Sequence, residues 1–111
     1  SVFVLDYDFN APTPEFLEQT HLPFYRAYRA KKPNVPIVII SNPDTDENFM
    51  KAKERFKVIM KTYTTAIKEG DRNVYLIDGK QLYGNFDREN CTVDGTHPND
   101  IGFYKMAKCI Y

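Results

Sequence analysis

The sequence predicts an α/β protein in which helices cover the faces of a parallel sheet. Three short, continuous apolar runs have the composition of strands that are buried on both faces. Longer amphipathic stretches separate these runs, and strands joined by helices of that length pair in parallel through right-handed crossovers. The chain has 111 residues, and domains usually hold about 100 to 200 residues. We therefore expect a single domain that spans residues 1–111.

The predicted strands cover residues 2–7, 36–40 and 73–78. The first, Val-Phe-Val-Leu-Asp-Tyr, follows Ser1 directly, so a run suited to a sheet interior has almost no chain before it. The second ends at Ser41 and the third stops at Gly79. In open parallel sheets, ligands bind beyond the carboxyl ends of the strands. Chemistry is therefore expected in the segments that follow these strands.

Three helices are predicted, over residues 13–30, over residues 46–69 and from residue 99 or 100 onward. Thr13-Pro14-Glu15 starts the first with a cap, a proline at the first helical position and an acidic first turn. Pro23 is expected to kink or restart that helix, and Gly70 to end the second. The second and last helices have apolar faces that should meet the core: Phe49, Ala52, Phe56, Ile59, Met60, Tyr63 and Ile67, and Ile101, Tyr104, Met106 and Ala107.

The balance of charges excludes some partners. Lysine and arginine total 15, aspartate and glutamate total 15, and the formal net charge is zero. A basic field is what holds most nucleic-acid-binding proteins to their ligand, so nucleic acid is not an expected partner. No apolar stretch approaches the roughly 20 residues that cross a bilayer, and the first residues lack a signal-peptide pattern. The sequence predicts no membrane span and leaves the compartment open.

The cysteines and histidines give no sign of a metal site. Cys91 and Cys109 are too few for a disulfide framework and too far apart for a two-residue metal clip. We interpret them as two ordinary thiols, and a bridge between them stays open for an exported protein. Neither histidine has an acid cluster beside it, so no zinc site is expected and no cofactor is implied.

The loop before the last helix reads Asp94-Gly95-Thr96-His97-Pro98-Asn99. With a glycine between them, a carboxylate three residues ahead of a histidine can accept a hydrogen bond from the imidazole. That bond fixes the tautomer and leaves the other ring nitrogen free to act as a base. The alternative is a turn in which Asp94 and Asp100 only cap the helix.

Asn10 follows the first predicted strand, in the segment Asp8-Phe9-Asn10-Ala11-Pro12. An asparagine at the carboxyl edge of a central strand can direct its side-chain amide at developing negative charge, as an oxyanion-hole donor does. An ordinary Asx turn ahead of Thr13 is the alternative interpretation.

Together, these segments resemble the third and fifth sequence blocks of the SGNH (GDSL-type) hydrolases, a family of esterases and acylhydrolases with a flavodoxin-like, three-layer α/β/α fold. Residues 8–11 are similar to the family's Gly-x-Asn-Asp block, and residues 94–98 to its Asp-x-x-His block. Asp8 and Ala11 depart from the first pattern, so only Asn10 is carried over from it. The resemblance implies that His97 is the general base, that Asp94 orients it and that Asn10 helps to form the oxyanion hole.

The nucleophile of that family is absent from the chain. It is a serine in a Gly-Asp-Ser block, and a further block supplies a glycine to the oxyanion hole; neither block occurs here. Ser1 and Ser41 are the two serines. Ser41 lies in an apparent strand-terminating turn, and Ser1 could attack only with its own α-amine as base. We expect the chain to be the carboxyl-terminal part of an SGNH hydrolase domain, holding about three strands, and to be inactive alone.

The predicted function is therefore ester hydrolysis by the complete enzyme, on a small-molecule ester or an acylated carbohydrate. The alternative is a small flavodoxin-like binding or regulatory module in which the Asp-x-x-His loop is structural. A phosphate-binding version lacks a glycine-rich loop after any strand. Loss of the neighbours of the first strand would leave an unpaired apolar edge, so we expect self-association or pairing with a missing amino-terminal fragment.

Other polar and aromatic residues have mainly structural interpretations. His21 is read as a surface or packing histidine rather than as a substrate contact, and Asp78 as the cap of the turn at Gly79. Asp44 and Asp46 are read as helix caps. The lysines of the second helix form its solvated face: Lys51, Lys53, Lys57 and Lys61. The residues that could wall an acyl or sugar pocket are Tyr83, Phe86 and Asp87.

Overall fold

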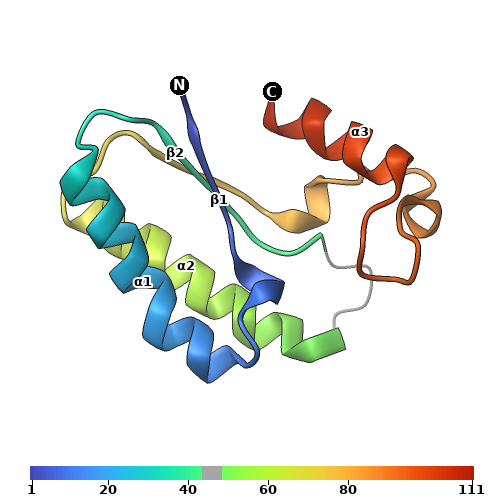
Figure 1. Ribbon diagram of the computed structural model, residues 1–111, viewed down its shortest axis with the longest axis horizontal. Coiled ribbons are helices and arrows are strands. Elements are labelled where there is room, and N and C mark those ends of the chain that lie inside the picture. Colours follow the sequence, from blue (N-terminus) through green and yellow to red (C-terminus); the bar gives the residue numbers. More distant parts are fainter. Residues whose placement is uncertain (44–48) are drawn as a thin grey trace.

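The computed structural model describes residues 1–43 and 49–111, with strands and helices in the predicted order (Figure 1). Strands β1 (Phe3–Asp6), β2 (Ile37–Ile40) and β3 (Val74–Ile77) form one parallel sheet in the order β1-β2-β3. Phe3 pairs with Ile37, which pairs in turn with Val74, so the three strands start in register. The predicted α/β class with a parallel sheet is confirmed.

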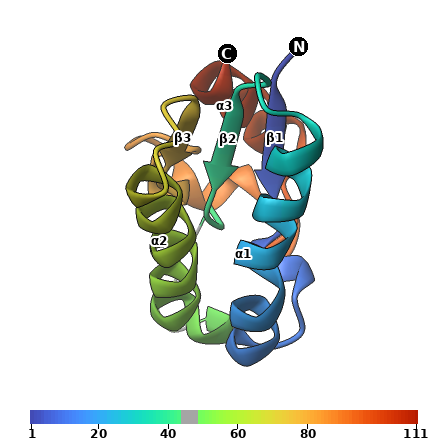
Figure 2. The same ribbon diagram turned by 90° about the vertical axis from the view of Figure 1, so that its left-hand side faces the viewer.

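The sheet lies between two layers of helices. Helices α1 (Pro14–Lys31) and α2 (Ala52–Lys68) pack side by side on one face (Figure 2), and α3 (Asp100–Ile110) lies on the other (Figure 1). Along β2, Ile37 and Ile39 enter the core beneath α1 and α2, whereas Ile40 belongs to the core beneath α3. The central strand is therefore buried on both faces, as its continuous apolar run predicts.

Strand β1 is an edge strand, and its two faces differ. Leu5 is buried in the core beneath α1 and α2, and the ring of Phe3 stacks on Tyr28 at 3.9 Å. Val2 and Val4, on the other hand, are exposed. Among the described residues β1 has a neighbouring strand on one side only, which is the unpaired apolar edge that the sequence predicts when the other neighbours of this run are missing.

Helix α1 begins as predicted but does not restart. The hydroxyl of Thr13 accepts a hydrogen bond from the backbone N–H of Phe16 at 3.1 Å, which caps the helix. The helix then continues through Pro23 to Lys31, so the second of the two predicted outcomes, a restart, does not occur. Pro23 is exposed, so water can satisfy the backbone carbonyl that loses its helical partner there.

Helix α2 begins at Ala52 rather than near residue 46. A short 3₁₀ turn, Phe49–Lys51, precedes it, and Met50 and Lys51 have positive φ angles of 48° and 57°. Such angles are incompatible with a helix that runs through these residues. The predicted caps Asp44 and Asp46 lie outside the described residues.

The buried faces of α2 and α3 differ from the predicted ones. In α2 the predicted Ala52 and Ile59 are buried, but so are the polar Arg55 and Thr62. The predicted Ile67 is exposed, as is Phe49 in the turn before the helix. In α3 the buried face is centred on Gly102, and the predicted Ile101, Tyr104 and Ala107 are exposed; of the predicted residues, only Met106 packs against the core. A Cβ on Gly102 would lie 2.1 Å from the carbonyl oxygen of Cys91. Only a glycine at this position therefore lets α3 lie so close to Cys91.

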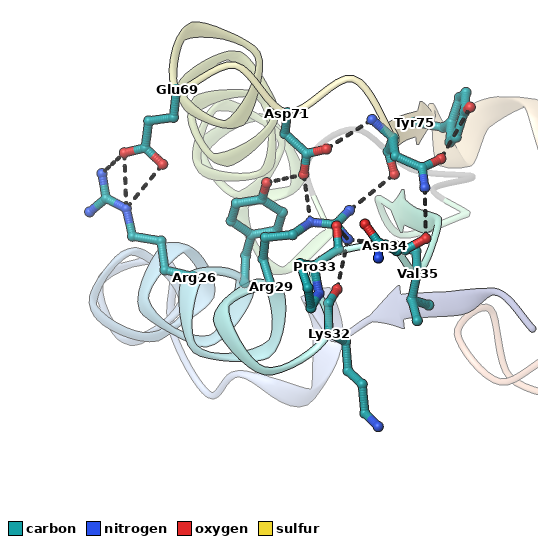
Figure 3. A network of polar contacts seen from close by, with 11 residues as sticks. Arg26, Arg29, Lys32, Pro33, Asn34, Val35, Glu69, Asp71 and Tyr75 are labelled. Atoms are coloured by element: carbon teal, nitrogen blue, oxygen red, sulfur yellow. Dashed lines mark hydrogen bonds and ion pairs between the residues drawn. The ribbon is translucent and has the colours of Figure 1, made fainter.

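A polar cluster joins the elements at the amino end of the sheet (Figure 3). Arg29 donates from Nε to Asp71 Oδ2 at 2.8 Å, and also to the backbone carbonyls of Val35 and Asn73 at 2.6 and 3.1 Å. The hydroxyl of Tyr25 donates to the same carboxylate. These contacts hold the end of α1 and the turns before β2 and β3 together, on the side of the sheet opposite to the strands' carboxyl ends.

Two further predictions concern the whole chain. Cys91 and Cys109 are both free, which confirms the interpretation as ordinary thiols. Among the helices of the described residues, none is both long and apolar enough to cross a membrane.

Candidate active site

Buried hydrogen bonds connect the segments that follow the three strands. After β1, Asp8 accepts hydrogen bonds from the backbone N–H and the side-chain amide of Asn42, which follows β2, at 2.9 and 2.6 Å. Ser41 Oγ accepts a hydrogen bond from the backbone N–H of Gly79, which follows β3, at 2.8 Å. A Cβ on Gly79 would lie 1.7 Å from the carbonyl oxygen of Asn42. The segments after β2 and β3 are therefore closely packed against each other.

Asp94 and His97 meet in the loop before α3. His97 Nδ1 lies 2.6 Å from Asp94 Oδ2. The other carboxylate oxygen, Oδ1, accepts hydrogen bonds from the backbone N–H groups of Thr96 and His97, at 2.9 and 2.8 Å. Gly95, with φ of 88°, lets the chain fold back between them. The predicted pairing of the carboxylate with the imidazole is thus present.

These contacts define the chemical states of the pair. The backbone N–H of His97, its side chain and the backbone N–H of Thr96 hold the pKa of Asp94 well below its usual range. An ionised carboxylate at Nδ1 favours the tautomer that carries its proton there, so Nε2 is the nitrogen left to accept a proton. The His97 side chain is 77% exposed, so that nitrogen is accessible to a reactant.

The loop is anchored on both sides. The backbone N–H of Val93 donates to the carbonyl of His97 at 2.8 Å. Asn99 caps α3 by accepting a hydrogen bond from the backbone N–H of Gly102 at 3.0 Å, and its side-chain amide donates to the carbonyl of Asn90 at 2.7 Å. Asn99 is therefore the cap of α3, and the helix begins at Asp100, within the predicted start at residue 99 or 100. The anchoring fixes the entry of the Asp94–His97 loop into α3.

Asn10 lies at the end of a 3₁₀ turn, Asp8–Asn10, directly beyond β1. Its backbone N–H donates to the carbonyl of Tyr7 at 3.1 Å, and its side chain is exposed. The contacts that the structure describes do not join Asn10 to Asp94 or His97. It therefore occupies the predicted strand end, while the pair occupies the loop before α3.

The two serines are not placed as nucleophiles. Ser41 is buried with its hydroxyl bonded to Gly79, which is the strand-terminating role that its sequence context indicates. Ser1 precedes the amino end of β1, whereas Asn10 follows the carboxyl end of the same strand (Figure 1).

The remaining predicted residues are structural or have no described role in the site. His21 is buried, with Nδ1 2.8 Å from Thr62 Oγ1, so it is a packing histidine. Asp78 caps the turn at Gly79 by accepting from the backbone N–H of Lys80 at 3.0 Å. Tyr83 is buried in the core beneath α3, so the prediction that it walls a pocket is wrong, and Phe86 is exposed.

A cavity of about 570 Å³ lies beside the Asp94–His97 loop. Its lining includes Asp94, Gly95 and the residues before them: Arg88, Glu89, Thr92 and Val93. Neither His97 nor Asn10 lines this cavity. The predicted pocket residue Asp87 does not line it either.

Asp8 and Arg55 were not identified from the sequence as a buried pair at the carboxyl ends of the strands. Both side chains are 1% exposed, and Arg55 Nη1 lies 3.7 Å from Asp8 Oδ1. A signal was present: Arg55 is three residues after Ala52 and four before Ile59, on the apolar stripe of the predicted helix. An arginine on such a stripe needs a buried partner, since an unpaired buried charge is costly.

The fold and the loop define a class of protein: parallel α/β proteins that carry an aspartate–histidine pair just before their last helix. The chain belongs to the GDSL-like lipase/acylhydrolase family, whose sequence model matches residues 1–111. No curated relative matches the chain.

Two solved structures are similar to the chain. One is a protein of Bacteroides ovatus described as a GDSL-like lipase, with 33% sequence identity, a TM-score of 0.78 and 98% of this chain covered. The other is the salicylyl-acyltransferase SsfX3 of a tetracycline biosynthetic pathway, with 21% identity, a TM-score of 0.67 and 95% covered. The chain spans 33% of the length of each. Its sheet and helices are thus part of the flavodoxin-like α/β fold of GDSL-like proteins.

Proposed function

We propose that this chain supplies the general base, its orienting carboxylate and one oxyanion donor of a serine ester hydrolase. The general base is His97, the orienting carboxylate is Asp94 and the oxyanion donor is Asn10. The serine comes from a segment outside the chain. The observation that carries the proposal is the 2.6 Å contact between His97 Nδ1 and Asp94 Oδ2, in a loop held by the same carboxylate. Membership of the GDSL-like lipase/acylhydrolase family supports it.

The residues divide the reaction between them. The serine hydroxyl attacks the carbonyl carbon of an ester, and His97 Nε2 accepts its proton. The tetrahedral intermediate carries an oxyanion, to which the side-chain amide of Asn10 donates. As the intermediate collapses, His97 returns the proton to the departing alkoxide. Water then attacks the acyl-enzyme in the same way and releases the acid and the free serine, while ionised Asp94 stabilises each imidazolium.

The position of the two serines supports a nucleophile outside the chain. Ser41 is buried and bonded to Gly79, and Ser1 is at the opposite end of β1 from Asn10. The solved structures that resemble the chain are about three times its length, since it covers 33% of each. We infer that the chain alone is inactive. The substrates proposed for the complete enzyme are small-molecule esters or acylated carbohydrates.

The test uses the full-length gene product, a fluorophosphonate probe and a p-nitrophenyl ester. The probe should label a serine outside residues 1–111, and His97→Ala should lower turnover by about a thousandfold or more. His21→Gln is the matched control, because it alters the other histidine, which is buried against Thr62, and it should keep most of the turnover.

Two results would contradict the proposal. A His97→Ala enzyme that keeps most of its esterase rate would remove His97 from the reaction. A full-length protein that neither reacts with the probe nor hydrolyses esters would favour the binding module, in which the Asp94–His97 loop is structural.

A further inference from the structure

The 3₁₀ turn Asp8–Asn10 presents its three side chains to different surroundings. Asp8 is fully buried, Phe9 is half-buried and Asn10 is exposed. The turn has three residues, so contacts that restrain Asp8 and Phe9 also restrain the backbone from which the Asn10 side chain projects. The contacts of Asp8 and Phe9 decide how well Asn10 is held.

Asp8 is held from two other elements. Its Oδ2 accepts from the backbone N–H and the side-chain amide of Asn42, beyond β2. From α2, Arg55 Nη1 donates to the backbone carbonyl of Asp8 at 2.7 Å and lies 3.7 Å from Asp8 Oδ1. Arg55 is itself fixed, because its Nε donates to the carbonyl of Met50 at 2.7 Å. Both the backbone and the side chain of Asp8 are thereby restrained.

The same arginine also restrains Phe9. The guanidinium carbon of Arg55 lies 5.8 Å from the centre of the Phe9 ring, within the range of a cation–π contact. On another side, the ring of Phe49 meets Phe9 edge-on at 5.8 Å, with an interplanar angle of 86°. Arg55 therefore contacts two successive residues of the turn and leaves the third, Asn10, unobstructed.

Stability alone does not explain why a buried ion pair occupies this position. Well-packed apolar residues of similar volume often stabilise a protein as well as a buried pair does, because the pair must lose its hydration. What the pair adds is directional: it fixes the backbone carbonyl of Asp8 and the ring of Phe9 relative to α2 and to the segment after β2. Fixing the backbone in this way matters where a neighbouring side chain must be held in one orientation.

We propose that Asp8 and Arg55 are positioning residues that hold the 3₁₀ turn so that the Asn10 amide faces the oxyanion. This inference rests on the proposed function, in which Asn10 is the donor. It concerns residues that do not touch the substrate. Asp8 stands where the related sequence block has a glycine, so the role is specific to the way this chain builds its turn.

The expected kinetic effect is on turnover rather than on substrate binding. An oxyanion donor acts where charge develops in the transition state, so its displacement weakens the transition state more than the ground state. A misplacement of about 1 Å can cost about a hundredfold in rate. Disturbing Asp8 or Arg55 should therefore lower kcat and leave KM nearly unchanged.

The experiment measures kcat and KM of the full-length protein on a p-nitrophenyl ester, per mole of folded protein after size exclusion. Asp8→Asn and Arg55→Lys should lower kcat by about 10- to 100-fold with KM within about twofold. Matched controls are Asp71→Asn and Arg29→Lys, which alter the ion pair at the amino end of the sheet (Figure 3). They should lower the melting temperature and leave kcat per folded molecule unchanged.

A second variant covers the case in which Asp8→Asn does not fold. The double substitution Asp8→Asn and Arg55→Met removes both charges, so neither is left buried without a partner. It should fold and show the same loss of kcat. Unchanged kcat in this variant, or in Asp8→Asn and Arg55→Lys, would overturn the inference.

Two reference variants separate this inference from the proposed function. If Asn10→Ala and His97→Ala lose activity while the Asp8 and Arg55 variants keep theirs, only the positioning role is wrong. If Asn10→Ala itself keeps full turnover, Asn10 is no oxyanion donor, and the positioning inference fails together with that one role in the proposed function, whereas the roles of His97 and Asp94 are tested separately by His97→Ala.

Discussion

His21 is buried between α1 and α2, where a polar ring has little contact with water. Its Nδ1 bonds to Thr62 Oγ1, its Nε2 has no hydrogen-bond partner among the described residues, and the Tyr7 ring stacks on it with 6.3 Å between ring centres. Burial lowers the pKa of His21 from 6.5 to about 4, because the charged form would lose its hydration. The folded state therefore holds this histidine neutral under conditions in which an unfolded chain protonates it.

The first prediction concerns this residue and pH. From pH 6.5 down to about 4, the unfolded His21 takes up a proton that the folded one does not, so the free energy of unfolding falls as pH falls. The slope from this residue is at most about 1.4 kcal/mol per pH unit. Urea unfolding across this window should show the fall in the parent and a smaller one in His21→Gln. Equal slopes would contradict the assignment.

At the scale of elements, the cluster around Arg29 connects α1 to the turns before β2 and β3 (Figure 3). Arg29 and Asp71 are mostly buried, with side chains 16% and 11% exposed. The neighbouring pair Arg26 and Glu69 joins α1 to the residue that follows α2, but this pair is exposed. Because water screens exposed pairs, the buried arginine should contribute much more to stability than the exposed one.

The second prediction compares these two arginines. Arg29→Met leaves Asp71 and several backbone carbonyls without their donor, so it should lower the free energy of unfolding by about 1.5–3 kcal/mol. Arg26→Met removes an exposed partner of Glu69 and should leave the stability within experimental error. Urea titrations of both variants test this difference. Similar effects of the two substitutions would mean that the buried network does not clamp these elements.

At the scale of the molecule, the sheet has an unpaired edge with apolar surroundings. In the part of the chain that the structure describes, β1 pairs with β2 on one side and has no partner strand on the other. A groove of about 370 Å³ runs beside it, lined by residues 3–7 together with Thr20 and Phe24 of α1. Unpaired backbone groups next to apolar side chains form a template for another strand. We therefore expect this edge to pair with a preceding segment of the full-length protein or, in its absence, with a second copy.

The third prediction is that residues 1–111, prepared alone, self-associate. A lysine at Val4 places a charge on the exposed face of β1 and should shift the chain toward the monomer, since edge charges oppose strand pairing. Ile67→Lys is the control, because Ile67 is also exposed but lies on α2. Sedimentation velocity distinguishes these species. A parent chain that sediments as a clean monomer would contradict the prediction.

Periodicity and loop chemistry predicted most of the fold. The apolar runs located all three strands, and Thr13, Gly70 and Asn99 lie at helix ends as expected. These features are local, because capping, turn formation and strand burial depend on residues close together in the chain. The Asp94–His97 contact is also local: three residues and a glycine with positive φ are enough to form it.

Other features depend on partners far apart in the sequence. The apolar pattern of the second helix does not reveal which partners Arg55 and Thr62 have, because those partners, Asp8 and His21, lie more than 40 positions away in the sequence. The buried face of α3 also differs from the predicted one. It is set by the close contact between Gly102 and the carbonyl group of Cys91, which the apolar pattern of the helix does not reveal.

The sequence by itself thus determined the order of the elements, the parallel sheet and the aspartate–histidine loop, since short-range geometry and burial specify them. Only the tertiary structure decided which polar side chains are buried and how the segment carrying Asn10 is held. A buried charge is tolerated only where a partner meets it, and here the partner of Asp8 is Arg55 of α2, which lies 47 residues later in the sequence.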